Sequence, residues 1–143
     1  MITKPFVCVL LMVCAGAASA AEPACVTVEQ GWVRVSQGPM PMSAGYGVIR
    51  NNCKAPVVVV AADSTAFGDV SLHQTTLVDG ISRMRAVERL PIAPGASAEL
   101  KPGGLHLMLM QPQAPLSAGA VVPLQLRLED GRKVDGTLTA RTP

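Results

Sequence analysis

Short runs of strand-forming residues, broken at close intervals by glycine and proline, constrain the fold of this chain most. Valine, threonine and leucine fill the runs, while 13 glycines and 12 prolines separate them. No segment carries an extended helical periodicity, and short runs bounded by turn residues are typical of β-strands. The pattern predicts an all-β fold, a Greek-key sandwich or barrel of eight or nine short antiparallel strands.

Local signals within these runs predict where the chain turns and bends. The alternating segment 25–36 contains Gln30-Gly31, which predicts a β-bulge. Residues 55–61 are a continuous apolar run, as expected of a strand that is buried on both faces or paired in a covered sheet. Asp79-Gly80 and Asp130-Gly131 predict hairpin turns, because aspartate and glycine tolerate positive φ.

The N-terminal 20 residues have the three parts of a secretory signal peptide. Lys4 supplies a positive charge, Phe6 to Ala15 form an apolar segment, and Ala18-Ser19-Ala20 match a cleavage site. The apolar segment is shorter than the roughly 20 residues that a spanning helix needs. A lipoprotein alternative at Cys14 is less favoured, since Val13 stands where a small residue is wanted. We expect residues 1–20 to be cleaved and residues 21–143 to form one exported domain.

The charge balance gives no sign of a nucleic-acid or membrane-binding protein. Removing Lys4 from the 12 basic residues leaves 11 against 10 acidic ones. The near-neutral chain carries no charge run, so neither nucleic acid nor an anionic membrane surface is an expected partner.

Two of the four cysteines, Cys25 and Cys53, remain after the expected cleavage. An exported protein folds in an oxidising compartment, where thiols pair. We therefore expect a Cys25–Cys53 disulfide. The alternative, that the two thiols bind metal, is weaker because neither lies near the histidines in sequence.

The only two histidines each lie near a methionine, in the pattern H-x10-M-x21-H-x-M. The four residues are His73, Met84, His106 and Met108. Imidazole and thioether groups without carboxylates suit Cu(I) far better than Mg²⁺, Ca²⁺ or Mn²⁺. The pattern predicts a protein that handles copper.

Strand geometry brings members of this set onto a shared face. A two-residue turn at Asp79-Gly80 pairs Thr75 with Met84, so His73 and Met84 point the same way, diagonal to each other. A three-residue loop would place them on opposite faces. His106 and Met108 share a face of the strand that follows Gly104. The four side chains converge only if the two regions of sheet adjoin or face each other.

A purely structural role for each residue is the alternative. Methionines commonly fill gaps in cores, and single histidines are common in any protein. Met40, Met42 and Met110 are expected to pack, although each could assist a soft metal site. Trp32, the only tryptophan, is expected to fill the core.

The spacing, with the segments around it, resembles the signature of the periplasmic copper chaperone family called PCu(A)C. The segments that carry the resemblance are Gly31–Arg34, Ser43–Asn51, Leu72–Leu90 and Leu100–Leu109. The resemblance implies a cupredoxin-like β-barrel that binds one Cu(I) through His73, Met84, His106 and Met108. It also implies delivery towards the dinuclear copper centre of a haem–copper (cytochrome c) oxidase, alongside a thioredoxin-like assembly factor.

The sequence departs from some members of that family in two ways. Gln74 stands where some relatives have methionine, and the chain ends at Pro143 without the His/Met-rich tail that some carry for Cu(II). A second copper site is therefore not expected. The expected protein is a periplasmic monomer without enzymatic activity.

Three other functions compete with the chaperone hypothesis. Copper storage or buffering would use the same four residues. A blue-copper electron carrier needs a cysteine thiolate beside two histidines, and the strand around His106 has none. A non-metal interaction module would use the four residues only for packing.

Overall fold

The computed structural model describes residues 24–36, 38–39 and 41–143. The expected signal peptide, Cys14 and Met40 lie outside the described residues.

Ten strands and no helix make up the described part of the chain, which confirms the all-β prediction. They are β1 (Val26–Arg34), β2 (Met42–Asn51), β3 (Val57–Asp63), β4 (Phe67–Val78), β5 (Ile81–Ala86), β6 (Leu90–Ile92), β7 (Ser97–Leu100), β8 (Leu105–Pro112), β9 (Val121–Leu128) and β10 (Lys133–Arg141). The number exceeds the predicted eight or nine because the interrupted segment 90–104 still forms two short strands, β6 and β7. No described helix is long and apolar enough to cross a membrane.

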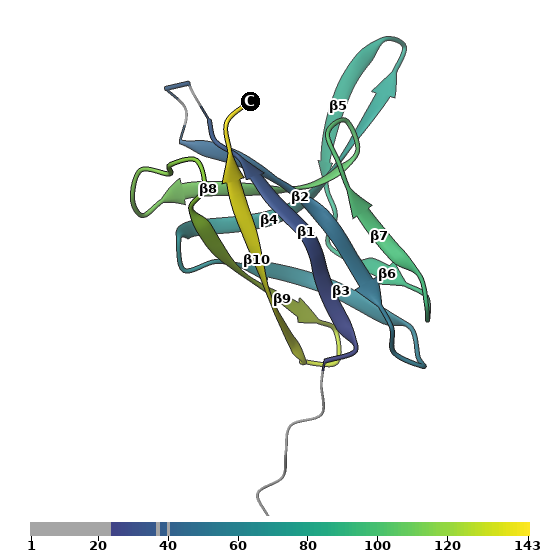
Figure 1. The fold of residues 1–143 in the computed structure, drawn as a ribbon. Coiled ribbons are helices and arrows are strands. Elements are labelled where there is room, and N and C mark those ends of the chain that lie inside the picture. The colour runs from purple at the N-terminus through teal and green to yellow at the C-terminus, as the bar shows by residue number, and fades with distance from the viewer. Residues whose placement is uncertain (1–23, 37, 40) are drawn as a thin grey trace, which may run out of the picture.

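The strands form one sheet in the order β5-β4-β8-β2-β1-β10-β9-β3-β6, with β7 pairing with β2. The sheet curls over on itself, so that β1, β2 and β10 lie in front of β3 and β4 (Figure 1). One pair, β1 with β10, is parallel, which an expectation of antiparallel strands alone did not include. In this pair the first and the last strand of the described chain run in the same direction along the sandwich.

Alternate apolar side chains fill the space between the two layers. Leu107 and Leu109 of β8 are 2% and 0% exposed, as their alternation with His106 and Met108 predicted. The apolar run 57–60 of β3 alternates between buried and half-buried positions. Strands β9 and β10 bring further buried leucines and valines to the same core. The outer face of β4 and β8 is thereby left to the histidines and methionines.

The bulge predicted at Gln30-Gly31 is present and decides which side chains of β1 face outward. The register with β2 shifts between Glu29 and Trp32, and Gln30 has a φ of 53°. A Cβ on Gly31 would overlap the carbonyl of Thr137, so only glycine fits there. Beyond the bulge Val33 points into the core, and Trp32 lies on the outer face, half-exposed. The expectation that Trp32 fills the core is therefore wrong.

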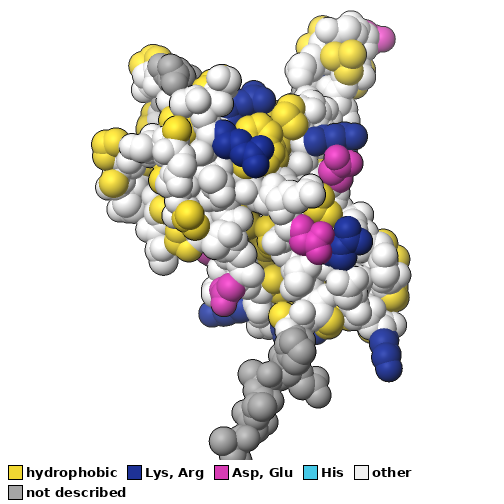
Figure 2. All heavy atoms as spheres, viewed as in Figure 1, with side chains coloured by type: hydrophobic (Ala, Val, Ile, Leu, Met, Phe, Trp, Pro, Cys, Tyr) yellow, Lys and Arg dark blue, Asp and Glu magenta, His cyan; other side chains and the backbone are white. Residues whose placement is uncertain are grey.

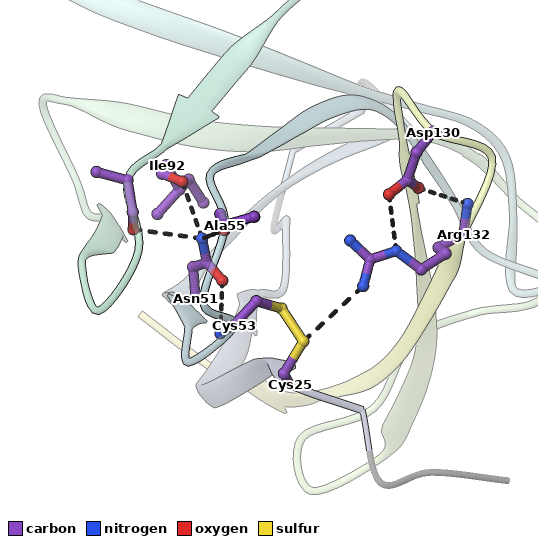
Figure 3. The surroundings of a disulfide bond; sticks show 8 residues. Cys25, Asn51, Cys53, Ala55, Ile92, Asp130 and Arg132 are labelled. Atoms are coloured by element: carbon purple, nitrogen blue, oxygen red, sulfur yellow. Dashed lines mark hydrogen bonds and ion pairs between the residues drawn. A yellow bond between two sulfur atoms is a disulfide. The ribbon is translucent and has the colours of Figure 1, made fainter.

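The expected disulfide joins Cys25, just before β1, to Cys53, just after β2, with a Cα–Cα distance of 4.9 Å. Figure 3 shows the buried side chain of Asn51 beside it, donating to the carbonyls of Ala55 and Ile92 and accepting from the backbone N–H of Cys53. In Figure 1, β1 begins and β2 ends at the end of the sandwich away from the β4–β5 hairpin, so the disulfide that joins these two strand ends lies there. The two thiols bind each other, which removes them as candidate metal ligands.

Candidate metal centre

The β4–β5 hairpin has the register that its turn predicted. Asp79 and Gly80 both have positive φ, 50° and 77°, as a two-residue hairpin turn requires. Thr75 pairs with Met84 and His73 with Ala86. His73 and Met84 therefore share a face, in the diagonal relation that the sequence predicted.

Strand β8 lies directly beside β4, which answers how the two halves of the pattern meet. His73 pairs with His106, and Ser71 pairs with Met108. Directly opposite residues of paired strands share a face. His73 is thus opposite His106 and diagonal to both Met84 and Met108. We call this outer surface, made by His73, Met84, His106 and Met108, the His/Met face.

The two imidazole rings lie close and almost parallel. Their centroids are 6.1 Å apart and their planes make an angle of 26°. Behind them, Leu72 and Leu107 are buried in the core. The strands that carry the rings are therefore backed by the apolar core, and Met84 of β5 and Met108 of β8 lie on the same outer face as the rings.

The buried imidazole of His106, which is 4% exposed, is fixed in one tautomer. Its Nδ1 lies 2.9 Å from the carbonyl oxygen of Gly104, which can only accept, so Nδ1 carries the proton. The same carbonyl accepts the backbone N–H of Thr75 at 3.1 Å. Nε2 is then the ring nitrogen of His106 that is left for a metal, and such a backbone contact is the usual way in which a metal-binding histidine is oriented.

The half-buried imidazole of His73 lies with its Nε2 2.9 Å from the Ser71 hydroxyl. Burial, and then the neighbouring His106, lower the pKa of His73 below its ordinary value, while Asp69 acts to raise it. The neutral ring is the form that binds metals. The environment of His73 thus favours the form that can act as a ligand.

The two methionines differ in exposure. Met84 on β5 is 54% exposed, whereas Met108 on β8 is half-buried. Met110 and Met42 pair with each other one row farther along the same outer face. Their position agrees with packing beside the four residues, and Met110 is opposite Asp69.

The chemistry of the donor set fits a soft metal ion. In the part of the chain that the structure describes, no group of three or more His, Cys, Asp or Glu side chains could hold a metal ion. A site on the His/Met face therefore depends on thioether sulfur. Two imidazoles and two thioethers suit Cu(I).

Two supporting groups were missed by sequence reasoning, the Ser71 hydroxyl and the Gly104 carbonyl. Ser71 lies two residues before His73 and so on the same face, a signal that parity alone could have given. The role of Gly104 depends on the side-chain conformation of His106, which no sequence pattern indicates.

The comparisons with known proteins agree with this fold. The family described as "Putative lipoprotein LpqE-like" matches residues 26–140. "Putative lipoprotein Lxx21020" of Leifsonia xyli subsp. xyli is 36% identical over 107 residues, which cover 74% of this chain. The match covers 63% of that relative, so the chain spans less than two thirds of its length.

Two solved structures are similar to this one. The Cu(I) form of DR1885 from Deinococcus radiodurans has a TM-score of 0.66 and 30% identity, over 85% of this chain and 81% of its own. The apo PCuAC domain from PmoF1 has a TM-score of 0.68 and 22% identity, over 84% and 96%. The cupredoxin-like class is thereby confirmed. The chain belongs to the LpqE-like family, and the resemblance of its sequence to the PCu(A)C proteins is confirmed.

Proposed function

We propose that this protein is an exported metallochaperone that binds one Cu(I) through His73, Met84, His106 and Met108. The observation that carries the proposal is the direct pairing of His73 with His106 on adjacent strands, with a methionine beside each. The Cu(I) form of the 30% identical DR1885 supports the choice of ion. The lipoprotein description of the family supports export.

The donor set would hold Cu(I) with little rearrangement of the backbone. His106 offers its Nε2, since its Nδ1 proton is engaged by Gly104. His73 exchanges its hydrogen bond with Ser71 for the metal if it binds through Nε2. Both thioethers are uncharged and take up no proton, so protons do not compete with the metal for them. The loaded site carries the single charge of the ion, which costs less to hold near apolar residues than a divalent ion would.

Release would begin at Met84. All six residues of β5 are exposed, and β5 is an edge strand that pairs only with β4. An incoming ligand can therefore approach the metal from the side of β5 while His106 still holds it from the buried side. Such exchange passes copper directly to the acceptor without releasing the free ion into solution. Direct transfer is what distinguishes a chaperone from a storage protein.

The family resemblance supports the destination. Copper would pass towards the dinuclear copper centre of a haem–copper oxidase, with a thioredoxin-like assembly factor as a partner. In this proposal residues 1–20 are removed near Ala20, and residues 21–143 act in the periplasm as a single monomeric domain. The protein moves a metal ion and catalyses no reaction.

Anaerobic titration with Cu(I) against a chromogenic chelator tests the site. We expect one Cu(I) per chain, and in His73→Ala and Met84→Leu a loss of affinity at least as large as the about 10- to 100-fold that removal of an outer-shell partner costs. Met110→Leu is the matched control, because it removes a thioether from the same face one row away. Equal affinity in the wild type, His73→Ala and Met84→Leu would show that the site is elsewhere.

A stopped-flow series over the concentration of a thiolate acceptor separates chaperone from storage protein. A rate that rises with acceptor concentration supports direct transfer. A rate that stays constant means unassisted release, and the storage function then replaces the chaperone function.

A further inference from the structure

Four side chains near the His/Met face form a second cluster, which the copper site does not use. Trp32 and Tyr46 pack with ring centroids 4.6 Å apart. The guanidinium of Arg34 lies 5.8 Å from the centroid of Trp32 and 5.6 Å from that of Tyr46. The guanidinium of Arg141 lies 5.3 Å from the centroid of Trp32. We call these four residues the arginine–aromatic platform.

The platform and the His/Met face belong to one continuous outer surface of the sheet. Arg34 of β1 pairs with Ala44 of β2, and Ala44 pairs with Met108 of β8. Arg34 also pairs with Arg141 of β10. The Cα atoms of Met108 and Arg34 are two strand spacings apart, about 10 Å. A partner that covers the platform therefore also comes close to the copper ligands.

The two guanidinium groups of the platform are exposed and adjacent. In the described residues neither Arg34 nor Arg141 forms an ion pair, so both charges are available to a partner. Both groups also lie over the ring of Trp32. The platform therefore presents two neighbouring positive charges on one aromatic base to a partner that supplies negative charge.

Figure 2 shows this surface from the side of β1 and β10, with Lys or Arg side chains gathered around a hydrophobic group near the upper ends of both strands. Tryptophan, tyrosine and arginine are the residue types that contribute most to binding at protein interfaces. A guanidinium that already lies over an aromatic ring loses little freedom when it binds a carboxylate.

We propose that the arginine–aromatic platform docks an acidic protein surface, that of the partner which exchanges copper with this chain. The inference rests on the proposed function for the identity of the partner. The carboxylates of the partner pair with Arg34 and Arg141, and the copper ligands of both proteins are thereby held within one interface.

The first test needs no copper and uses Trp32 as the reporter. A hexaglutamate peptide is added to the metal-free protein at low salt while the tryptophan fluorescence is followed. We expect a saturable change that weakens with added salt and is lost in Arg34→Gln/Arg141→Gln. Loss of the change in the control variant Arg127→Gln/Lys133→Gln as well, or an equal change with acetate at the same carboxylate concentration, would overturn the proposal.

The control pair is matched to the platform. Arg127 and Lys133 are exposed cross-strand partners on β9 and β10, so their replacement removes the same charge from the same kind of position. Lys133 lies eight residues from Arg141 along β10, about 26 Å away. Circular dichroism verifies that both double variants are folded.

The second test measures transfer to two acceptor peptides with the same pair of cysteines, flanked by glutamate in one and serine in the other. Copper should pass to the acidic acceptor at least about tenfold faster at low salt, and this ratio should fall to near one in Arg34→Gln/Arg141→Gln alone. An unchanged ratio in that variant contradicts the docking surface. Failure of the protein to bind Cu(I) refutes the proposed function, and the fluorescence test then still decides whether the platform binds acidic peptides.

Discussion

The disulfide end and the hairpin end of the sandwich are built from the same kind of strand but differ in how firmly their side chains are held. At the disulfide end, Asn51 is 0% exposed and its amide contacts the backbone of Ala55, Ile92 and Cys53. At the hairpin end, every residue of β5 is exposed, and Leu77 of β4, near the hairpin turn, is 75% exposed. One end is cross-linked and its buried amide is hydrogen-bonded, and the other is exposed to solvent.

Under the proposed function, this difference separates the part of the molecule that stabilises the fold from the part that exchanges metal. A chaperone must let one ligand leave while another arrives, so at least one of the proposed ligands has to lie on a weakly held element. Met84 lies on such an element, whereas His106 is 4% exposed beside the core. We expect the covalent cross-link to stabilise the fold without restricting the hairpin.

The largest expected effect comes from breaking the disulfide end. The Cys25–Cys53 bond closes a loop of sequence separation 28, worth about 3.6 kcal/mol of unfolding free energy on the chain-entropy model. Cys25→Ser/Cys53→Ser should therefore melt at a lower temperature, measured by circular dichroism, and still bind Cu(I) with wild-type affinity. Loss of copper binding without a change in melting temperature would make the thiols part of the metal site. It would contradict the purely structural role of the disulfide end.

A smaller effect is expected from the carboxylate near the histidines. Asp69 raises the pKa of His73, so Asp69→Asn should lower that pKa further and move the loss of Cu(I) affinity to lower pH. Competition titrations between pH 5 and 8 measure the shift, with Asp63→Asn, an exposed carboxylate on β3, as the control. Identical pH profiles for the wild type and Asp69→Asn would show that protonation of His73 does not control binding.

The same shift has a consequence for the metal-free protein. The pKa of His73 is lower in the folded than in the unfolded chain. Well above pH 6.5 the imidazole of His73 is neutral in both the folded and the unfolded chain. As the pH falls through that value, the imidazole takes up a proton in the unfolded chain before it does so in the folded chain. The stability of the metal-free protein therefore decreases on acidification.

The smallest expected effect lies at the tip of the hairpin. Leu77 is 75% exposed, so Leu77→Ala should change the free energy of unfolding by less than about 0.5 kcal/mol. The matched change Leu124→Ala, at a residue 3% exposed on β9, should cost about 2–5 kcal/mol. Chemical denaturation of the two variants measures the contrast. Similar losses would mean that the hairpin tip is packed in solution.

Local signals predicted the parts of the site that lie within one hairpin. Asp79-Gly80 specified its turn, and the turn specified the register of His73 and Met84. The pairing of β4 with β8 could not be predicted, because it joins residues more than 30 positions apart and depends on how the whole sheet closes. The sequence pattern named all four residues of the proposed ligand set, but only the strand pairing of the structure places them on one face.

Trp32 shows that the alternation of residues along a strand does not by itself predict which side chains are buried. One extra residue at the Gln30-Gly31 bulge reverses which side chains face the core. The bulge was predicted, but its effect on Trp32 was not. Which side of a strand faces the core depends on the strands that pair with it. Arg141 was missed for a similar reason, since only the parallel pairing of the first strand, β1, with the last strand, β10, places it beside Arg34.

The most direct measurement of the central claim is copper K-edge X-ray absorption of the Cu(I)-loaded protein. We expect two nitrogen and two sulfur neighbours, and one sulfur fewer in Met84→Leu, because the hairpin end supplies one of the two thioethers. Met110→Leu should leave the spectrum unchanged. A first shell of nitrogen and oxygen alone, or a shell that Met84→Leu does not alter, would contradict a site on the His/Met face.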